Sequence, residues 1–146
     1  KYFVLKTDAK KNILFNPDES IDFNGHTGPF IQYTYARINS VLKRIEDFKT
    51  THIINRPLIA EEKKIIRMML DYPDVIHQSA SSLNPSILAN FVYNLAKDYN
   101  QFYQNISILN ADNKNDVYFR LTLSKKVGEI IENSMNLLGI KVPLKM

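Results

Sequence analysis

The stretch from Asn24 to Arg44 constrains the fold more than any other part of the chain, because a turn signal and a helical pattern meet in it. Gly25 and Gly28 allow backbone angles that other residues avoid, and Pro29 suits the start of a helix, where its missing amide hydrogen is not needed. At about 100° per residue, the apolar residues that follow fall on one arc, namely Ile31, Tyr35, Ile38, Leu42 and Ile45. The sequence therefore predicts a helix that starts near Pro29 and packs this arc against a core.

Further segments have the spacing of amphipathic helices. The first covers residues 58–70, and we expect a break at Tyr72-Pro73 with a second, short helix after it. Asn84-Pro85 is a strong helix start, and the stripe that follows steps by three or four through Leu88, Phe91, Val92, Leu95, Tyr99, Phe102 and Ile106. The last helix covers residues 116–138 and should end at Gly139, as a left-handed cap. These segments predict an all-α fold, a bundle of about five helices.

Residues 1–23 have no such pattern and contain two short apolar runs, residues 2–5 and 13–15, which predict a small hairpin or extended pair. Because the chain starts inside an apolar run, we expect it to be part of a longer protein. We interpret residues 1–23 as a short, partly extended connector and residues 24–146 as the helical domain. The polar segment 49–57, which closes with a proline, is expected to be a loop.

Composition restricts the class of protein further. The chain has no cysteine, so it forms no disulfide and has no thiolate to bind a metal or act as a nucleophile. No apolar run approaches the ~20 residues of a membrane span, and we expect a cytoplasmic protein. The net charge of +4 is concentrated, because residues 24–57 carry +3 (5 basic, 2 acidic) and residues 113–146 also carry +3 (6 basic, 3 acidic). This surplus is a mild indication of a surface that faces phosphate groups.

Residues typical of catalysis or metal binding are not grouped in the sequence. His26, His52 and His77 lie in different segments without a ligand-type partner four residues away, so we expect them in turns or on the surface. Glu61 and Glu62 have no paired carboxylate at a fixed spacing, and a solvated helix face explains them. No glycine loop of the phosphate-binding type is present. We therefore expect no catalytic site, no metal and no cofactor in this chain.

A second arc on the helix after Pro29 consists of Phe30, Tyr33 and Arg37, at positions i, i+3 and i+7. This spacing places two aromatic rings and a guanidinium side by side, which suits a flat, electron-rich ligand. Aromatic residues at helical spacing more often pack than bind, however, and an arginine beside them is often a surface charge. The arc alone therefore favours a packing role for these residues over a binding role.

The run FNGHTGPFIQYTYARINSVLKR, residues 23–44, resembles a segment of arginyl-tRNA synthetases whose usual form is close to G-N-T-G-P-Y-x-Q-Y-A-x-x-R. In that family the segment joins the catalytic domain to a helical anticodon-binding domain. Residues 84–103 are similar to the middle helix of that domain, and residues 120–146 to its closing helix and tail. Residues 1–22 resemble the piece after the second ATP-binding signature. Neither signature, HIGH or KMSKS, occurs here, so the resemblance is to a C-terminal part without the catalytic centre.

The resemblance implies that the chain reads tRNA. In the family this domain grips the anticodon loop of tRNA(Arg), splays out its bases and reads the middle one, a cytosine. Stacking rings and a planar guanidinium suit such bases, and the matching positions here are Phe30, Tyr33, Arg37, Tyr103 and Met146. Phe30 stands where the family more often has Tyr, so stacking survives but a hydroxyl contact is lost. Candidates for phosphate contacts are Arg44, Lys125 and Lys126.

The same resemblance implies the activity of a whole enzyme. The full-length family member is a class I ligase that joins arginine to tRNA(Arg) with ATP and Mg, and this fragment alone is expected to be inactive. Its expected partners are the tRNA and the catalytic domain of the same chain, in a monomer without membrane attachment. Two alternatives remain open: the anticodon-binding domain of another class I synthetase, such as the cysteine enzyme, and a helical protein-interaction module. Salt separates the module from RNA binding, because phosphate contacts weaken steeply with ionic strength.

Overall fold

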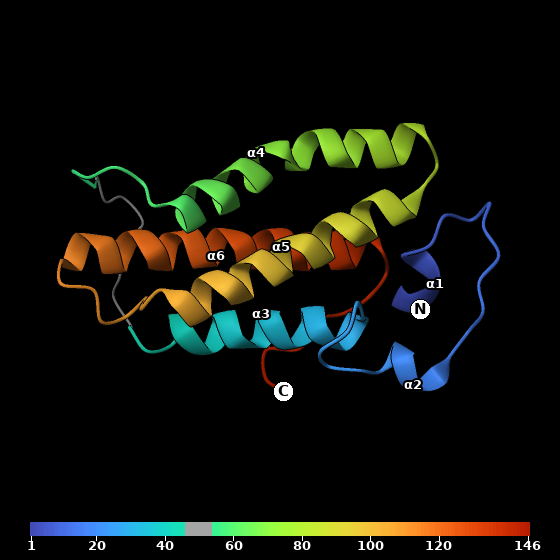
Figure 1. Cartoon of the computed structure of the whole chain (residues 1–146), viewed down its shortest axis with the longest axis horizontal. Helices are drawn as coiled ribbons and strands as arrows, with labels where there is room; N and C mark the ends of the chain where they lie inside the picture. The colour runs from blue at the N-terminus through green and yellow to red at the C-terminus, as the bar shows by residue number, and fades with distance from the viewer. Residues whose placement is uncertain (46–53) are drawn as a thin grey trace.

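The computed structural model describes residues 1–45 and 54–146, and six helices lie within them. Two are single turns and four are long: α1 (Tyr2–Leu5), α2 (Pro17–Ser20), α3 (Gly28–Leu42), α4 (Ala60–Ser81), α5 (Pro85–Asn105) and α6 (Lys114–Leu137). Figure 1 shows the long helices side by side as a bundle, with the N-terminal segment at the end where α3 and α5 begin and α6 finishes. The described residues contain no strand, and the predicted all-α bundle is confirmed.

Caps fix the ends of the long helices as the sequence predicts. The Thr27 hydroxyl accepts a hydrogen bond from the Phe30 amide at 3.3 Å, so α3 begins one residue before Pro29. The Asn84 side chain caps α5 in the same way. After α6, Gly139 has a φ of +68°, which is the left-handed conformation predicted for it. These three boundaries are confirmed because they depend on local chemistry.

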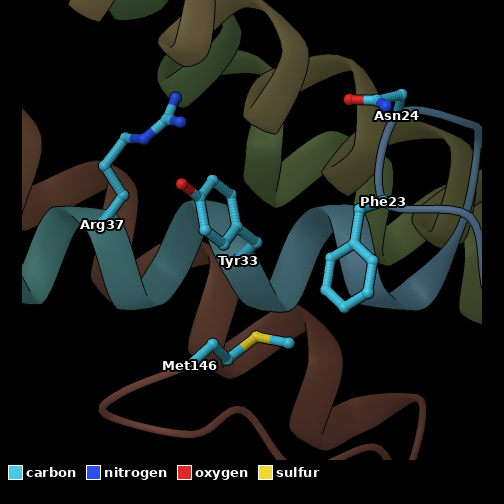
Figure 2. Close-up of a pocket in the computed structure, with 5 residues that line it drawn as sticks. All are labelled: Phe23, Asn24, Tyr33, Arg37 and Met146. Carbon is cyan, nitrogen blue, oxygen red and sulfur yellow. The ribbon is translucent and has the colours of Figure 1, made fainter.

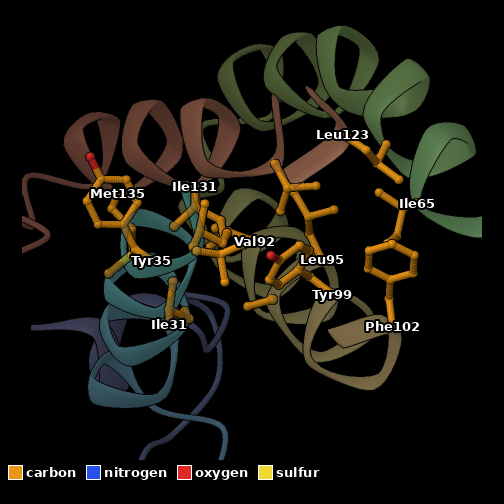
Figure 3. Close-up of a cluster of buried hydrophobic side chains, with 14 of the residues drawn as sticks. Ile31, Tyr35, Ile65, Val92, Leu95, Tyr99, Phe102, Leu123, Ile131 and Met135 are labelled. Carbon is orange, nitrogen blue, oxygen red and sulfur yellow. The ribbon is translucent and has the colours of Figure 1, made fainter. Parts of the chain in front are cut away.

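One core joins the four long helices, and α5 contacts each of the other three. Figure 3 shows its centre, where buried side chains from all four helices meet, among them Ile31, Tyr35, Ile65, Val92, Leu95, Tyr99, Phe102, Ile131 and Met135. The arc predicted on α3 is part of this core. Helices α3 and α6 approach closely at Gly128, where an added Cβ would lie only 3.1 Å from Ile38 Cγ2. Because α3 buries this arc, Tyr33 and Arg37 are directed away from the core.

The hairpin predicted for the first residues is wrong. Residues 2–5 form the helical turn α1, and residues 13–15 have no regular structure. Tyr2 is buried, and its hydroxyl donates to the carbonyl oxygen of Ala89 on α5 at 2.8 Å. A helical turn satisfies its backbone hydrogen bonds locally, so the apolar run docks on the bundle without a partner strand.

The predicted break at Tyr72-Pro73 is also wrong, because α4 continues through Pro73. Proline removes one backbone hydrogen bond and bends a helix, and Figure 1 shows α4 changing direction near its middle. Packing holds the two halves together: the Tyr72 ring stacks on Phe91 of α5, with ring centres 5.6 Å apart. The proline therefore kinks one helix where two were expected.

The solvated helix face predicted for Glu62 is wrong. Its side chain is fully buried and accepts two hydrogen bonds from Arg56 at 2.8 Å, one from Arg120 at 3.2 Å and one from the Ile59 amide at 3.2 Å. Arg56 also pairs with Asp116 at 3.0 Å. Burial alone would raise the pKa of Glu62, but these hydrogen bonds outweigh it and hold the pKa below its usual range. The cluster fastens the segment before α4 to α6.

Residues 46–53 lie outside the described part of the chain, and with them His52 and much of the predicted loop 49–57. The described end of that loop, residues 54–59, is irregular up to the start of α4, as expected. Within the described residues, no helix combines the length and the apolar character needed to cross a bilayer.

Candidate nucleic-acid interface

The outward face of α3 presents an arginine between two tyrosine rings. The central guanidinium carbon of Arg37 lies 4.8 Å from the centre of the Tyr33 ring and 5.0 Å from that of Tyr103, which comes from α5. Both distances are within the range of a cation–π contact. Tyr33 remains 42% exposed, so much of its ring is open to a ligand.

A chain of hydrogen bonds from the core holds Arg37 in this position. Its Nη1 donates to Asn100 Oδ1 at 2.6 Å, and Asn100 Nδ2 donates to Thr34 Oγ1 at 2.7 Å. The Thr34 hydroxyl in turn donates to the carbonyl oxygen of Phe30 at 2.9 Å. Among the described residues, no carboxylate lies within 4.0 Å of the Arg37 guanidinium. Its charge is thus fixed in direction but not neutralised.

The C-terminal tail folds back onto α3. After Gly139, the Lys141 carbonyl oxygen accepts a hydrogen bond from Gln32 Nε2 at 2.7 Å. Figure 1 shows the chain end lying beside α3, and Figure 2 shows Met146 close to Tyr33. The tail therefore adds a wall to the surface that carries Arg37.

Two neighbouring clefts open on this surface. The first, which we call the Tyr103 cleft, has a volume of about 390 Å³ and is lined by Tyr33, Ala36, Arg37, Ser40, Tyr103, Lys145 and Met146. The second, the Phe23 cleft, has a volume of about 610 Å³ and is lined by Phe23, Asn24, Tyr33, Arg37 and Met146. Tyr33, Arg37 and Met146 belong to both clefts, which makes one continuous surface.

Four of the five residues predicted to bind an anticodon meet at the Tyr103 cleft, namely Tyr33, Arg37, Tyr103 and Met146. Phe30 does not line either cleft. It is half-buried and packs against Tyr93 of α5, with ring centres 5.3 Å apart. The arc predicted from spacing is thus divided, and only its Tyr33 and Arg37 part faces the clefts.

His26, to which the sequence assigns no role, supports the aromatic cluster around Phe30. Its ring stacks on Tyr93 with centres 3.8 Å apart, and its Nε2 lies 3.0 Å from the Tyr2 hydroxyl. Burial, together with the nearby Lys6 ammonium, lowers the pKa of His26 to about 4. The imidazole is therefore neutral at physiological pH and joins the turn before α3 to α1 and α5.

The predicted phosphate-contact residues lie in two different places. Arg44 is exposed and lines a hollow that also includes Tyr103, so it extends the same surface past the end of α3. Lys125 and Lys126 are exposed on α6 and line neither cleft. Lys126 pairs with Glu129 at 2.8 Å. Of the three, only Arg44 shares a hollow with a residue of the predicted site.

Sequence reasoning missed several residues of this surface. Phe23 and Asn24 were assigned to the connector and the turn, although an aromatic residue beside a turn before a helix was a usable signal. Lys145 precedes Met146 in the tail and could have been named with it. Asn100 interrupts an apolar helix at a buried position, and a buried amide usually has a specific partner, which here is Arg37.

Aromatic rings and an arginine guanidinium beside open clefts are groups that proteins use to bind unstacked nucleobases. Comparison with known proteins defines the family more closely. The model of the DALR anticodon binding domain matches residues 31–146, and the chain belongs to this family.

Two relatives and one solved structure illustrate the similarity of this chain to known proteins. The arginine-tRNA ligase of Phocaeicola vulgatus is 53% identical over 150 residues, and that of Flavobacterium psychrophilum is 48% identical over 146 residues. Both alignments cover 100% of this chain but only 25% and 24% of the relatives. Among solved structures, Thermus thermophilus arginyl-tRNA synthetase matches with a TM-score of 0.88 and 26% identity, over 99% of this chain and 25% of that one. The chain spans about a quarter of the length of these relatives.

Proposed function

We propose that this chain binds the anticodon loop of tRNA(Arg) as part of an arginine-tRNA ligase, and that the middle anticodon cytosine enters the Tyr103 cleft. The observation that carries the proposal is the Arg37 guanidinium, held between Tyr33 and Tyr103 by a buried asparagine. The family match and the names of the relatives support it. Joining arginine to the tRNA, with ATP and Mg, is then the work of the rest of the enzyme.

The Tyr103 cleft has the groups that a cytosine requires. Tyr33 and Tyr103 offer aromatic surface for stacking, which is worth about 1–3 kcal/mol per base. Arg37 supplies donors for the acceptors on the edge of the base, and the backbone near Met146 offers an acceptor for its amino group. A uracil has an acceptor in place of that amino group, so two acceptors would face each other without a hydrogen bond.

Positive charge around the cleft suits the phosphates of the loop. Lys145 lines the Tyr103 cleft, and Arg44, just after the end of α3, shares a neighbouring hollow with Tyr103. Contacts of this kind add affinity without sequence preference and weaken as salt rises. A steep fall of affinity with salt would therefore distinguish an RNA interface from a protein-interaction groove, where apolar contacts would dominate.

The connector supplies a second interface, toward the rest of the enzyme. Several of its large apolar side chains are exposed, namely Val4, Leu14, Phe15 and Ile21. Since the relatives are about four times as long as this chain, we assign this surface to the catalytic domain of the same polypeptide. A monomeric enzyme in the cytoplasm is the corresponding proposal for assembly and location.

Substitution of Arg37 tests the proposal. Arg37→Ala should weaken binding to an arginine anticodon stem-loop by roughly 10- to 100-fold, because it removes a planar charged contact to a base. The matched control is Arg67→Ala, which removes the same charge from an exposed position on α4 that lines neither cleft. Arg37→Lys keeps the charge and should restore only part of the affinity. Equal affinities for the Arg37→Ala and Arg67→Ala variants would refute the assignment.

A further inference from the structure

The proposed function assigns one base to the Tyr103 cleft and leaves the adjoining Phe23 cleft without an occupant. Figure 2 shows the rings of Phe23 and Tyr33 on either side of an open space, with Met146 below it and the Asn24 carboxamide above it. Phe23 is 52% exposed. Within the described residues, the Asn24 side chain has no hydrogen-bond partner, so both its donor and its acceptor are free.

The turn that presents Phe23 and Asn24 is tied to the start of α3. The Asp22 carboxylate accepts a hydrogen bond from the Asn24 amide at 2.8 Å, and the Asp22 carbonyl oxygen accepts one from the Thr27 hydroxyl. That same hydroxyl caps α3. Gly25 leaves room for this arrangement, since an added Cβ would lie 3.2 Å from Asp22 Oδ2. The backbone that carries these two side chains is therefore fixed relative to the start of α3.

We propose that the Phe23 cleft binds a second unstacked nucleobase, that of a nucleotide adjacent to the middle anticodon base, between the rings of Phe23 and Tyr33. This inference rests on the proposed function. Tyr33 lies between Arg37 and Phe23, so it separates the two clefts while lining both (Figure 2). Consecutive nucleotides splayed out of one loop would thus meet consecutive clefts.

The chemistry of the two clefts differs, and so does the selectivity expected of each. The Tyr103 cleft combines Arg37, Ser40, Lys145 and Tyr103, a polar set suited to reading one base edge. The Phe23 cleft shares Arg37 with the Tyr103 cleft, but the rest of its lining consists of two rings, a thioether and a single neutral amide. Every base has a π-face, and a carboxamide can both donate and accept, so this cleft should accept any base. No acidic side chain lines it.

A matched pair of phenylalanines tests this inference. Phe23 and Phe15 are both exposed residues of the N-terminal segment, at 52% and 58%, but Phe15 packs edge-on against Phe3 and lines neither cleft. Phe23→Ala and Phe15→Ala should be titrated with an arginine anticodon stem-loop. The same titrations should use loops with an abasic nucleotide on the 5′ or the 3′ side of the middle cytosine. Circular dichroism establishes that each variant is folded.

The expected result is a loss of about 5- to 20-fold for Phe23→Ala on the intact loop, and of less than about twofold for Phe15→Ala. One of the two abasic loops should bind the parent protein correspondingly less well, and Phe23→Ala should then have no further effect on that loop. That loop identifies which neighbour occupies the cleft. Exchanging the base at that position for another base should change affinity by less than about threefold.

Three results would overturn the inference: equal affinities of the two alanine variants, undiminished effects of Phe23→Ala on both abasic loops, or strong dependence on the identity of the neighbouring base. The first is also expected if a protein segment fills the cleft. Preference for the middle cytosine is a separate readout in the same titrations. If that preference persists while Phe23→Ala has no effect, the second base site is wrong and the proposed function stands.

Discussion

Replacing Glu62 should destabilise the bundle far more than replacing the neighbouring carboxylate of Glu61. Glu62→Gln keeps the size of the side chain but removes its charge. It also replaces one carboxylate oxygen, which accepts hydrogen bonds from the guanidinium groups, by an amide NH2 group, which only donates. Arg120 then loses its carboxylate, and Arg56 retains only Asp116. Removing one partner from a buried ion pair costs about 3–5 kcal/mol. Because Arg56 is 26% exposed and keeps one partner, we expect the lower end, about 3 kcal/mol.

The assay is urea unfolding followed by circular dichroism at pH 7. The matched control is Glu61→Gln, which alters the neighbouring carboxylate of the same first turn of α4, for which the described residues show no ion pair. We expect a change below about 0.5 kcal/mol for this control. Since native domains are stable by about 5–15 kcal/mol in total, the Glu62→Gln midpoint should fall well below that of the control.

The effect of Glu62→Gln should depend on pH in a defined direction. The folded-state pKa of Glu62 is lowered from 4.5, so the carboxylate contributes stability above that value and loses it as pH falls through the folded pKa. The difference between the parent and Glu62→Gln should therefore be full at pH 7 and shrink below about pH 4.5. Equal stability of the two glutamine variants at pH 7, or a difference that persists unchanged in acid, would refute the reasoning.

Three further changes probe other parts of the structure. Asn100→Ala should weaken anticodon stem-loop binding about tenfold in a fluorescence titration, because Arg37 loses the hydrogen bond that orients it; unchanged affinity would contradict this. Gly128→Val should lower the urea-derived stability by about 1–3 kcal/mol by crowding Ile38, whereas no loss would show that α3 and α6 can separate freely. His26 has a lowered pKa of about 4, so stability should fall as pH drops from 6.5 toward 4, and His26→Gln should flatten that slope in urea titrations at pH 7 and 5; an identical slope would rule out this role.

The sequence predicts the helices well where their limits are local. Caps and prolines at Asn84-Pro85 and near Pro29, and the glycine at 139, act on their own neighbours, so no knowledge of the fold is needed. The kink at Pro73 depends on packing of Tyr72 against another helix, which a single segment does not contain. Glu62 could not be distinguished from a surface carboxylate either, since its partner Arg120 is 58 residues away.

The candidate site was predictable in a similar, partial way. Helical spacing alone places Tyr33 and Arg37 on one face, while Tyr103 and Met146 come from the family resemblance. Phe30, which the same spacing groups with Tyr33 and Arg37, packs against Tyr93 and lines neither cleft. Helical periodicity does not reach Phe23, because its position depends on the fold of the turn before α3. Its sequence signal is an aromatic residue beside that turn.

The proposed function requires this surface to distinguish the middle base of an arginine anticodon. The most direct test is a fluorescence titration of the chain with an arginine anticodon stem-loop and with the same loop in which the middle cytosine is replaced by uracil, at two salt concentrations. We predict a clear preference for the cytosine, together with affinity for both loops that falls as salt rises. Salt-sensitive binding without any preference, or no binding to either loop, would contradict the claim.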